Sequence, residues 1–376
     1  METPFIFGKI ASAGFFTNRT EETSHLAGNF NSLINTVIIS PRRWGKSSLV
    51  QKSAEIIQQN NQDIRFCFID LFNIRSERQF YQHFSGEVLK ATSGKADEIM
   101  ETARNFLMRV VPSISFSPAP ETDLSVSFDW KEVQKQPDEI LNLPEKIAQE
   151  KKLRIMICID EFQNIAGFDE PVEFQKTLRA HWQKHQHVGY CLYGSKRHML
   201  LDVFNTQSMP FYKFGDVIYL DKIAEKHWIP FIVERFELSG KKVTENGAKL
   251  ICRLCENHPF YVQQLAHLSW LRTTTECDEL LVTEAFENLL LQLGFLYQTN
   301  TDSLSAPQVY FLDAVLKGEE KFSSKDVIQN YKLGTSANVS RIKKALINKE
   351  IIEIHKNNIE FIDPMYKHWL RVHYFR

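Results

Sequence analysis

The chain has 376 residues, of which 43% are hydrophobic and 24% charged, and its net charge at pH 7 is −1. This length predicts two or three domains, and this composition is ordinary for a soluble globular protein. The net charge excludes wholesale coating of nucleic acid but allows a local basic face. No apolar run approaches a membrane span and no signal-peptide pattern is present, so we expect no membrane partner. Six scattered cysteines without a disulfide framework favour a cytoplasmic location.

The first predicted element is a helix that follows an aromatic loop. Phe15 and Phe16 lead into it, and the apolar residues from Leu26 to Ile34 keep a helical spacing. If a nucleotide site follows, Arg19 either contacts the nucleotide or caps the core, and the spacing favours neither interpretation.

The stretch 40–48, Ser-Pro-Arg-Arg-Trp-Gly-Lys-Ser-Ser, lies between an apolar β-branched strand, Thr36–Ile39, and the start of a helix. This is the context of a phosphate-binding loop (Walker A), because backbone N–H groups and the helix dipole point at one polyphosphate. Lys46 is expected to reach the β- and γ-phosphates and Ser47 to ligate Mg²⁺. Ser40 replaces the first consensus glycine, so the loop must turn there without a positive φ. The predicted cofactor-binding residues of the loop are Pro41, Arg42, Arg43, Trp44, Gly45, Lys46, Ser47 and Ser48.

Between the loop and the next motif the sequence predicts a second buried strand at 64–71 and an amphipathic helix from about Glu77 to Ala91. A further helix is predicted at 137–150, interrupted near Pro144. Asp70 ends the strand, where a turn or cap role is commoner than a role in a site. Alternating residues on both sides of a Pro-rich segment predict an inserted hairpin at about 106–128.

A second motif is the apolar strand 153–159 that ends in Asp160-Glu161 (Walker B). Asp160 is expected beside the phosphate loop, where its carboxylate supports Mg²⁺. Glu161 is placed to orient and polarise an attacking water. Adjacent carboxylates are weak evidence alone, but after a phosphate loop and an intervening strand they indicate a nucleotide site.

His181 and His185 lie one turn apart on a helix predicted at 172–187. That spacing allows a metal site. No carboxylate or Cys partner is evident nearby, so we interpret them as part of a solvated face.

A further apolar strand begins at Val188 and ends at Gly194-Ser195. Ser195 is therefore placed to sense a γ-phosphate or its water. Lys196 and Arg197 follow. They either form a charged turn or stabilise the negative charge of a transferred phosphoryl group. A last short strand is predicted at 217–220.

Beyond 220 the chain becomes helical, with amphipathic segments at 226–237 and 244–255 and a further helix that starts at His258-Pro259. Cys252, Cys255 and His258 have a spacing that some metal sites share. Because no fourth ligand follows, core packing is the preferred interpretation.

The end of the chain reads as a winged helix. Helices at 306–316, 325–331 and 336–349 precede a predicted hairpin, which is the order in which a third helix often enters a DNA major groove. The residues expected on its exposed face are Ser336, Asn338, Arg341, Lys343 and Lys344. From 302 to the end, 12 Lys and Arg against 9 Asp and Glu give only +3, so DNA and protein partners both stay open.

The segment Phe-Thr-Asn-Arg at 16–19, the loop at 40–48, Asp160-Glu161 and Gly194-Ser195 together resemble the motifs of the AAA+-related ATPases of the STAND group. In particular, these motifs resemble those of the archaeal-type ATPase family, which is also common in bacteria. The resemblance implies ATP and a five-stranded parallel sheet. It also implies an order of strands in the sheet. The Asp-Glu strand (153–159) would lie next to the far neighbour of the first strand (36–39), and not beside the second strand (64–71).

The resemblance also extends to later residues. Asn257-His258-Pro259 loosely fits a motif that opens a lid helix, so Pro259 is an implied nucleotide contact. The family often has an arginine near the place of Lys213, which leaves Lys213, Arg197 or a neighbouring subunit as the source of an arginine-finger charge.

The predicted fold class is α/β: a P-loop NTPase domain (ASCE/AAA+-like) at 1–224, a helical lid at 225–300 and a winged-helix domain at 301–376. The leading hypothesis is an ATP-binding, Mg²⁺-dependent ATPase that couples nucleotide state to the lid and winged helix. Its catalytic residues are Lys46, Glu161 and Ser195, with Ser47 and Asp160 at the metal. The alternative is a very slow or non-hydrolysing ATP-gated switch that binds DNA or protein.

Overall fold

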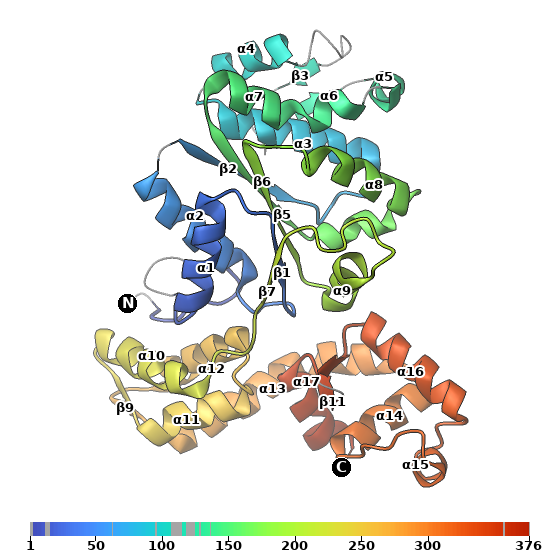
Figure 1. Ribbon diagram of the computed structural model, residues 1–376. Helices are drawn as coiled ribbons and strands as arrows, with labels where there is room; N and C mark the ends of the chain where they lie inside the picture. The colour runs from blue at the N-terminus through green and yellow to red at the C-terminus, as the bar shows by residue number, and fades with distance from the viewer. Residues whose placement is uncertain are drawn as a thin grey trace. The chain divides into compact units, whose positions relative to one another are not determined.

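The computed structural model describes residues 3–11, 16–61, 63–94, 96–106, 115–117, 125–127, 129–135, 137–355 and 358–375. The chain forms two compact units, one of Arg19–Asp221 and one of Met1–Asn18 together with Lys222–Arg376 (Figure 1). The N-terminal segment thus belongs with the C-terminal unit, because Phe5 packs against the rings of Phe231 and Phe236. This differs from the prediction, which placed residues 1–18 with the ATPase domain.

The unit Arg19–Asp221 is built on a five-stranded parallel sheet with the order β2-β5-β6-β1-β7. Its strands are β1 Thr36–Ile39, β2 Ile64–Asp70, β5 Arg154–Asp160, β6 Val188–Gly194 and β7 Asp216–Tyr219. The expected position of the Asp-Glu strand was wrong in one respect, since β5 pairs with β2 along its length, with Asp70 opposite Asp160. Its other neighbour, β6, does lie beside β1.

Helices cover both faces of this sheet, as buried parallel strands require. Figure 1 shows α1 and α2 on one face and α3, α7, α8 and α9 on the other. Val37 and Ile39 enter the core on the α3–α8 side, whereas Phe66 meets Phe30 of α1 on the opposite side. The helices are α1 Thr20–Asn31, α2 Lys46–Asn60, α3 Glu77–Thr92, α4 Ala96–Phe106, α5 Trp130–Lys135, α6 Pro137–Leu141, α7 Leu143–Lys151, α8 Pro171–Trp182 and α9 Arg197–Asn205.

The inserted hairpin is present, since β3 Ser115–Ser117 pairs antiparallel with β4 Ser125–Ser127. The residues between these strands lie outside the described ranges. The helix expected at 137–150 is interrupted, as predicted, but its break is at Asn142. Pro144 lies in the first turn of α7, where proline is tolerated.

In the other unit, residues 222–302 form four helices and a pair of very short parallel strands. These are α10 Glu225–Leu238, β8 Lys242–Val243, α11 Glu245–Leu254, α12 Pro259–Arg272, β9 Glu276–Cys277 and α13 Glu279–Asp302. Cys252 and Cys255 are buried in its core, which confirms the packing interpretation. All six cysteines are buried free thiols.

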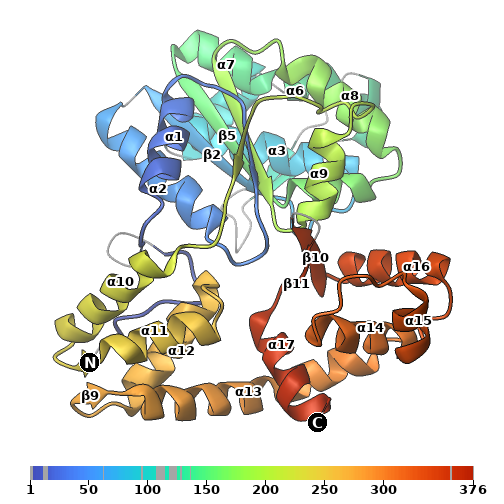
Figure 2. The ribbon, with the colours of Figure 1, turned by 60° about the horizontal axis from the view of Figure 1, so that its bottom comes forward.

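The predicted winged-helix elements are all present (Figure 2). They are α14 Ala306–Leu316, α15 Lys325–Asn330, α16 Ser336–Asn348, β10 Ile352–His355, β11 Asn358–Phe361 and α17 Pro364–Trp369, followed by a short π-helical turn, Leu370–Tyr374. The strands β10 and β11 pair antiparallel, and part of their turn falls outside the described residues.

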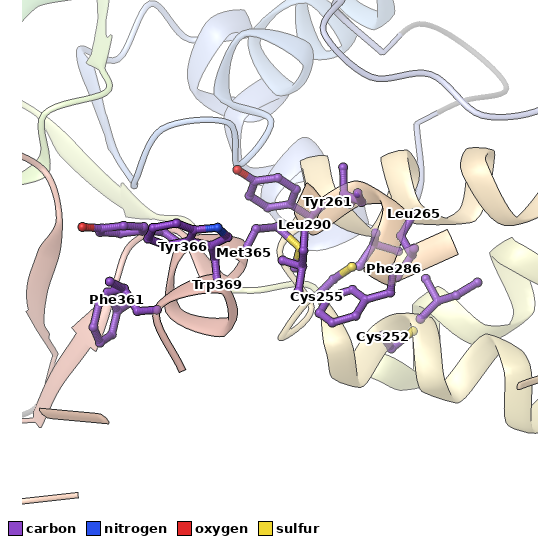
Figure 3. Packing of buried hydrophobic residues seen from close by; sticks show 14 of the residues in the cluster. Cys252, Cys255, Tyr261, Leu265, Phe286, Leu290, Phe361, Met365, Tyr366 and Trp369 are labelled. Atoms are coloured by element: carbon purple, nitrogen blue, oxygen red, sulfur yellow. The ribbon is translucent and has the colours of Figure 1, made fainter. Parts of the chain in front are cut away.

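One hydrophobic core joins the helices of the predicted lid to the winged-helix elements. Cys255, Phe286 and Leu290 lie in the same cluster as Met365 and Trp369 (Figure 3). The helix α13 also runs through the boundary that we predicted at 300/301. The three-domain division therefore stays a prediction, and the structure describes the lid and winged helix as one compact unit.

By length and composition alone, α13 would be able to cross a membrane. This is weak evidence, because a core helix passes the same test, and α13 buries Val282, Phe286 and Leu289. The expectation that no apolar segment approaches a span was nevertheless too strong.

Candidate nucleotide-binding site

The predicted phosphate loop connects β1 to α2 and ends at Gly45, the residue before the helix. Gly45 has a φ of 89° and Arg43 a φ of 65°, so the loop turns at these two left-handed residues. Ser40 is not among the residues with positive φ, which is how the loop accommodates serine in place of the consensus glycine. Gly45 accepts the first helical hydrogen bond, from the N–H of Leu49 at 2.9 Å.

Lys46 is the first residue of α2 and is buried, with 6% of its surface exposed. Its ammonium donates to the carbonyl oxygens of Pro41 at 2.9 Å and Ser40 at 3.4 Å. The cation therefore lies inside the curve of the loop, where an anion would meet it. Trp44 and Ser48 are also buried, whereas the side chains of Arg42 and Arg43 are exposed.

Ser47 and Asp160 meet at the edge of the sheet where β1 and β5 end. The Ser47 hydroxyl donates to Asp160 Oδ2 at 2.8 Å, and the N–H of Glu161 donates to Oδ1 at 2.8 Å. Burial raises the pKa of Asp160 to about 6, although both hydrogen bonds and the charge of Lys46 act in the opposite direction. A hydroxyl and a carboxylate oxygen are donors that suit Mg²⁺.

Glu161 follows β5 in a left-handed conformation, with a φ of 52°. Its Oε2 accepts hydrogen bonds from the Ser195 hydroxyl at 3.0 Å and from the Ser195 N–H at 3.3 Å. The side-chain amide of Gln163 also donates to Oε2. The structure thus brings the two predicted catalytic residues Glu161 and Ser195 together, since β5 and β6 are neighbours.

Sequence reasoning missed Gln163, a fully buried residue in the short 3₁₀ segment η2, Phe162–Gly167. The available signal was the polar pair Gln163-Asn164 in an otherwise apolar segment directly after the carboxylates.

Arg19, for which two roles were left open, is 4% exposed. Its guanidinium donates to Glu22 at 2.8 Å and to the carbonyl of Asp221 at 2.7 Å. These contacts favour the core-capping role, and a contact with nucleotide stays a prediction. Asp70 acts as a turn residue, accepting from the N–H of Phe72 at 2.8 Å.

The other predicted candidates are Lys213, Arg197 and Pro259. Lys213 holds its ammonium 5.4 Å from the centre of the Tyr212 ring, and Arg197 begins α9. Pro259 begins α12 in the other compact unit, so its predicted contact with nucleotide also stays a prediction.

The two histidines are less exposed than the prediction of a solvated face required. His181 contacts Asp138 at 3.0 Å, and His185 lies 2.9 Å from the Tyr190 hydroxyl. Both rings also approach Asn142. Among the described residues, no group of three or more His, Cys, Asp or Glu side chains is arranged to hold a metal ion.

Comparison with known proteins identifies the fold. The chain is similar to a Walker-type ATPase of Pyrococcus abyssi, with 17% identity, a TM-score of 0.67 and coverage of 98% of this chain and 100% of the other. It is also similar to the ORC2 protein of Aeropyrum pernix in ADPNP–ADP complexes, with 13% identity, a TM-score of 0.59 and coverage of 98% and 97%. A third likeness is to the ORC1 protein of the same organism in complex with DNA, with 10% identity, a TM-score of 0.52 and coverage of 99% and 98%.

A family described as a probable winged helix domain matches residues 295–372. No curated protein matches the chain. The fold is therefore that of the archaeal Walker-type ATPases and ORC proteins, a P-loop ATPase fold with a five-stranded parallel sheet and a C-terminal winged helix.

Proposed function

We propose that the protein is an ATP-binding, Mg²⁺-dependent ATPase. The observation that carries this proposal is the meeting of the Ser47 hydroxyl with the Asp160 carboxylate at 2.8 Å, beside Glu161 and at the start of α2. A helix start favours phosphate, and a hydroxyl beside a carboxylate provides the oxygen ligands of a divalent cation.

Each residue then has a distinct task. Lys46 binds the β- and γ-phosphates, and Ser47 with Asp160 would hold Mg²⁺, which supplies positive charge against the phosphate oxygens. Glu161 orients the attacking water and takes its proton. Ser195, which contacts Glu161, also lies where a γ-phosphate sensor is expected, at the end of β6.

Nucleotide state is proposed to act on the C-terminal unit. Its core is shared by the lid helices and the winged helix, which supports movement of this unit as one body. Pro259 at the start of α12 is the proposed point at which this unit senses the nucleotide.

The proposed partner is DNA or a protein. Arg341 and Lys344 are exposed on α16, as are Ser336 and Ser340. Two of the expected reading residues are otherwise engaged: Asn338 donates to the carbonyl of Leu333 at 2.7 Å, and Lys343 lies 5.0 Å from the centre of the Phe322 ring. The remaining basic face is small, which leaves room for either partner.

A second candidate is a very slow ATP-gated switch. It is favoured by Lys213, which lies near the place where the family that this chain resembles often has an arginine, and which holds its ammonium over Tyr212. Without an arginine-finger charge, intrinsic phosphoryl transfer is slow.

The test is phosphate release from ATP and Mg²⁺, with ATP binding measured in parallel and both assays repeated with duplex DNA. The proposal expects turnover by the wild type, binding without turnover by Glu161→Gln and loss of binding by Lys46→Ala. Glu173→Gln changes an exposed carboxylate of α8 and serves as the control. ATP binding without phosphate release under every condition would favour the switch, and absence of ATP binding would reject both candidates.

A further inference from the structure

Gln163 is the polar side chain beside the site to which the proposed chemistry gives no task. It is fully buried, and its amide nitrogen donates to Glu161 Oε2. A fully buried glutamine loses its contacts with water, so its position needs an explanation in the hydrogen bonds that it makes.

The hydrogen bonds to Glu161 are all on one side of its carboxylate. Among the described residues, the three donors are the hydroxyl and N–H of Ser195 and the amide of Gln163, and all three contact Oε2. Oε1 is thereby left to accept a proton. Donors on one oxygen fix the rotation of the carboxylate, which decides where the other oxygen points.

Gly194 makes room for this arrangement. A Cβ built on Gly194 would lie 1.8 Å from Gln163 Oε1, 2.9 Å from Gln163 Cδ and 3.3 Å from Glu161 Cα. The two approaches to Gln163 are far inside contact distance, and the approach to Glu161 is tight. The backbone of Gly194 does not require glycine, because its φ is not positive. The glycine at the end of β6 is therefore explained by the side chain of Gln163, which lies where a methyl group would be.

The other end of the amide is less favourably placed. Gln163 Oε1 is buried and has no hydrogen-bond partner among the described residues. Reversing the amide would give Oε1 no better environment and would turn a carbonyl oxygen towards the Glu161 carboxylate. The hydrogen bond to Glu161 is consequently the polar contact that holds the side chain.

We propose that Gln163 is a positioning residue that, with Ser195, fixes Glu161 Oε2 and aims Oε1 at the attacking water. The effect of Gln163 on turnover rests on the proposed ATPase function, whereas its role in orienting the Glu161 carboxylate does not. Gly194 is part of the same arrangement, because a larger residue at this position would displace the Gln163 side chain.

The kinetic test compares Gln163→Ala, Gly194→Ala and the double variant in ATP hydrolysis. Each single change is expected to lower kcat about 10- to 100-fold, as misplacement of a catalytic group does. The KM for ATP should stay within about twofold, because the proposal places neither residue on the nucleotide. In the double variant the new methyl group enters the space vacated by the glutamine, so its kcat should be no lower than that of Gln163→Ala.

A second readout needs no turnover. Carboxylates of the nucleotide-free protein are coupled to an amine with a carbodiimide, and the rate at Glu161 is followed by peptide mass spectrometry. Both single variants should label Glu161 faster than the wild type, while the exposed Glu173 reacts equally in all proteins.

The two readouts separate the possible failures. An unchanged labelling rate at Glu161 would overturn the proposal, whether or not the protein hydrolyses ATP. If the wild type is active and the variants label Glu161 faster but keep the wild-type kcat, the proposal is also overturned. Gln163 would then orient Glu161 without any effect on catalysis. If the losses of kcat add in the double variant and parallel the losses of thermal stability, Gln163 and Gly194 have a packing role instead.

Discussion

The Ser47 hydroxyl donates a hydrogen bond to Asp160 Oδ2 at 2.8 Å although 113 residues separate the two in sequence. The contact joins the first turn of α2 to the end of β5, which are not adjacent elements in the chain. Parallel strands whose carboxyl ends share one edge bring such residues together, and this edge is where open α/β sheets bind ligands.

The first prediction concerns this contact. Ser47→Ala should weaken binding of ATP in the presence of Mg²⁺ by about tenfold or more, since it removes an oxygen ligand and a hydrogen bond to a charged group. Binding of ATP without Mg²⁺ should change little. Calorimetric titration with and without the metal measures both. Ser53→Ala on the same helix removes a buried hydroxyl that has no hydrogen-bond partner in the described part of the chain, and it is the matched control.

The second prediction assigns Arg19 to stability. Arg19→Gln should lower the free energy of unfolding by about 2 to 4 kcal/mol, because the hydrogen bonds to Glu22 and to the carbonyl of Asp221 are lost from a buried site. ATP affinity should be unchanged at temperatures where the variant is folded. Urea unfolding and ATP titration decide the matter, with the exposed Arg78→Gln as control. Intact stability with weakened ATP binding would instead support a direct contact with nucleotide.

Local pattern was sufficient to predict the strands that carry the site. Apolar runs marked β1, β5 and β6, and the residues at their ends were predicted as one site. The structure brings Ser47 to Asp160 and Glu161 to Ser195, and the roles of these residues stay predictions. Both contacts depend on strand ends that the hydrophobic pattern locates well.

Pairing between distant segments was harder to predict. The position of β5 beside β2 depends on tertiary packing that no local pattern encodes. Phe5 was assigned to the wrong unit for the same reason, since its partners lie beyond residue 230. Gln163 escaped notice because its environment depends on the missing Cβ of Gly194.

The third prediction concerns pH. Burial lowers the pKa of His185 to about 4, against the opposing charge of Glu145 and together with that of His181. The unfolded chain therefore binds a proton near pH 6.5 that the folded protein does not, and stability should fall as the pH drops from 6.5 towards 4.

The slope from this group is at most about 1.4 kcal/mol per pH unit. His185→Gln keeps a polar side chain beside Tyr190 but does not titrate, so its free energy of unfolding should depend less steeply on pH. Urea unfolding at several pH values from 7 downward measures the difference. Parallel curves for the two proteins would contradict the assignment.

The fourth prediction concerns Asp363, which ties the winged helix to the preceding helices. Its Oδ2 accepts from the hydroxyls of Tyr261 at 2.6 Å and Tyr297 at 3.1 Å, and its Oδ1 accepts from the N–H groups of Met365 and Tyr366. Asp363→Ala should destabilise this unit by about 2 to 4 kcal/mol, because it removes a helix cap and the charged acceptor of two buried hydroxyls, which are then left with only each other at 3.4 Å.

Asp363→Asn is the matched comparison. It keeps the size of the side chain and the cap acceptor, and the tyrosine hydroxyls are able to accept from its amide. Its loss of stability should therefore be clearly smaller than that of Asp363→Ala. Thermal and urea unfolding of both variants provide the measurement. Equal losses would mean that the charge of Asp363, rather than its hydrogen-bond geometry, holds the unit together.

The fifth prediction separates the basic residues of α16. Arg341 and Lys344 are exposed, whereas Lys343 packs its ammonium over the ring of Phe322. If α16 contacts DNA, Arg341→Ala and Lys344→Ala should each weaken binding to duplex DNA. Each should also reduce the slope of log affinity against log salt by about 1, as loss of one phosphate contact does.

Lys343→Ala is the internal control, because it removes the same charge from the same helix at a position that packs against the protein. It should affect stability more than DNA affinity. Fluorescence anisotropy over a range of salt concentrations measures the slope for all three variants. Equal losses of affinity from all three would point to a general electrostatic attraction rather than contact through this face. Unchanged DNA affinity in all three would remove α16 from the DNA interface and favour a protein partner for the winged helix.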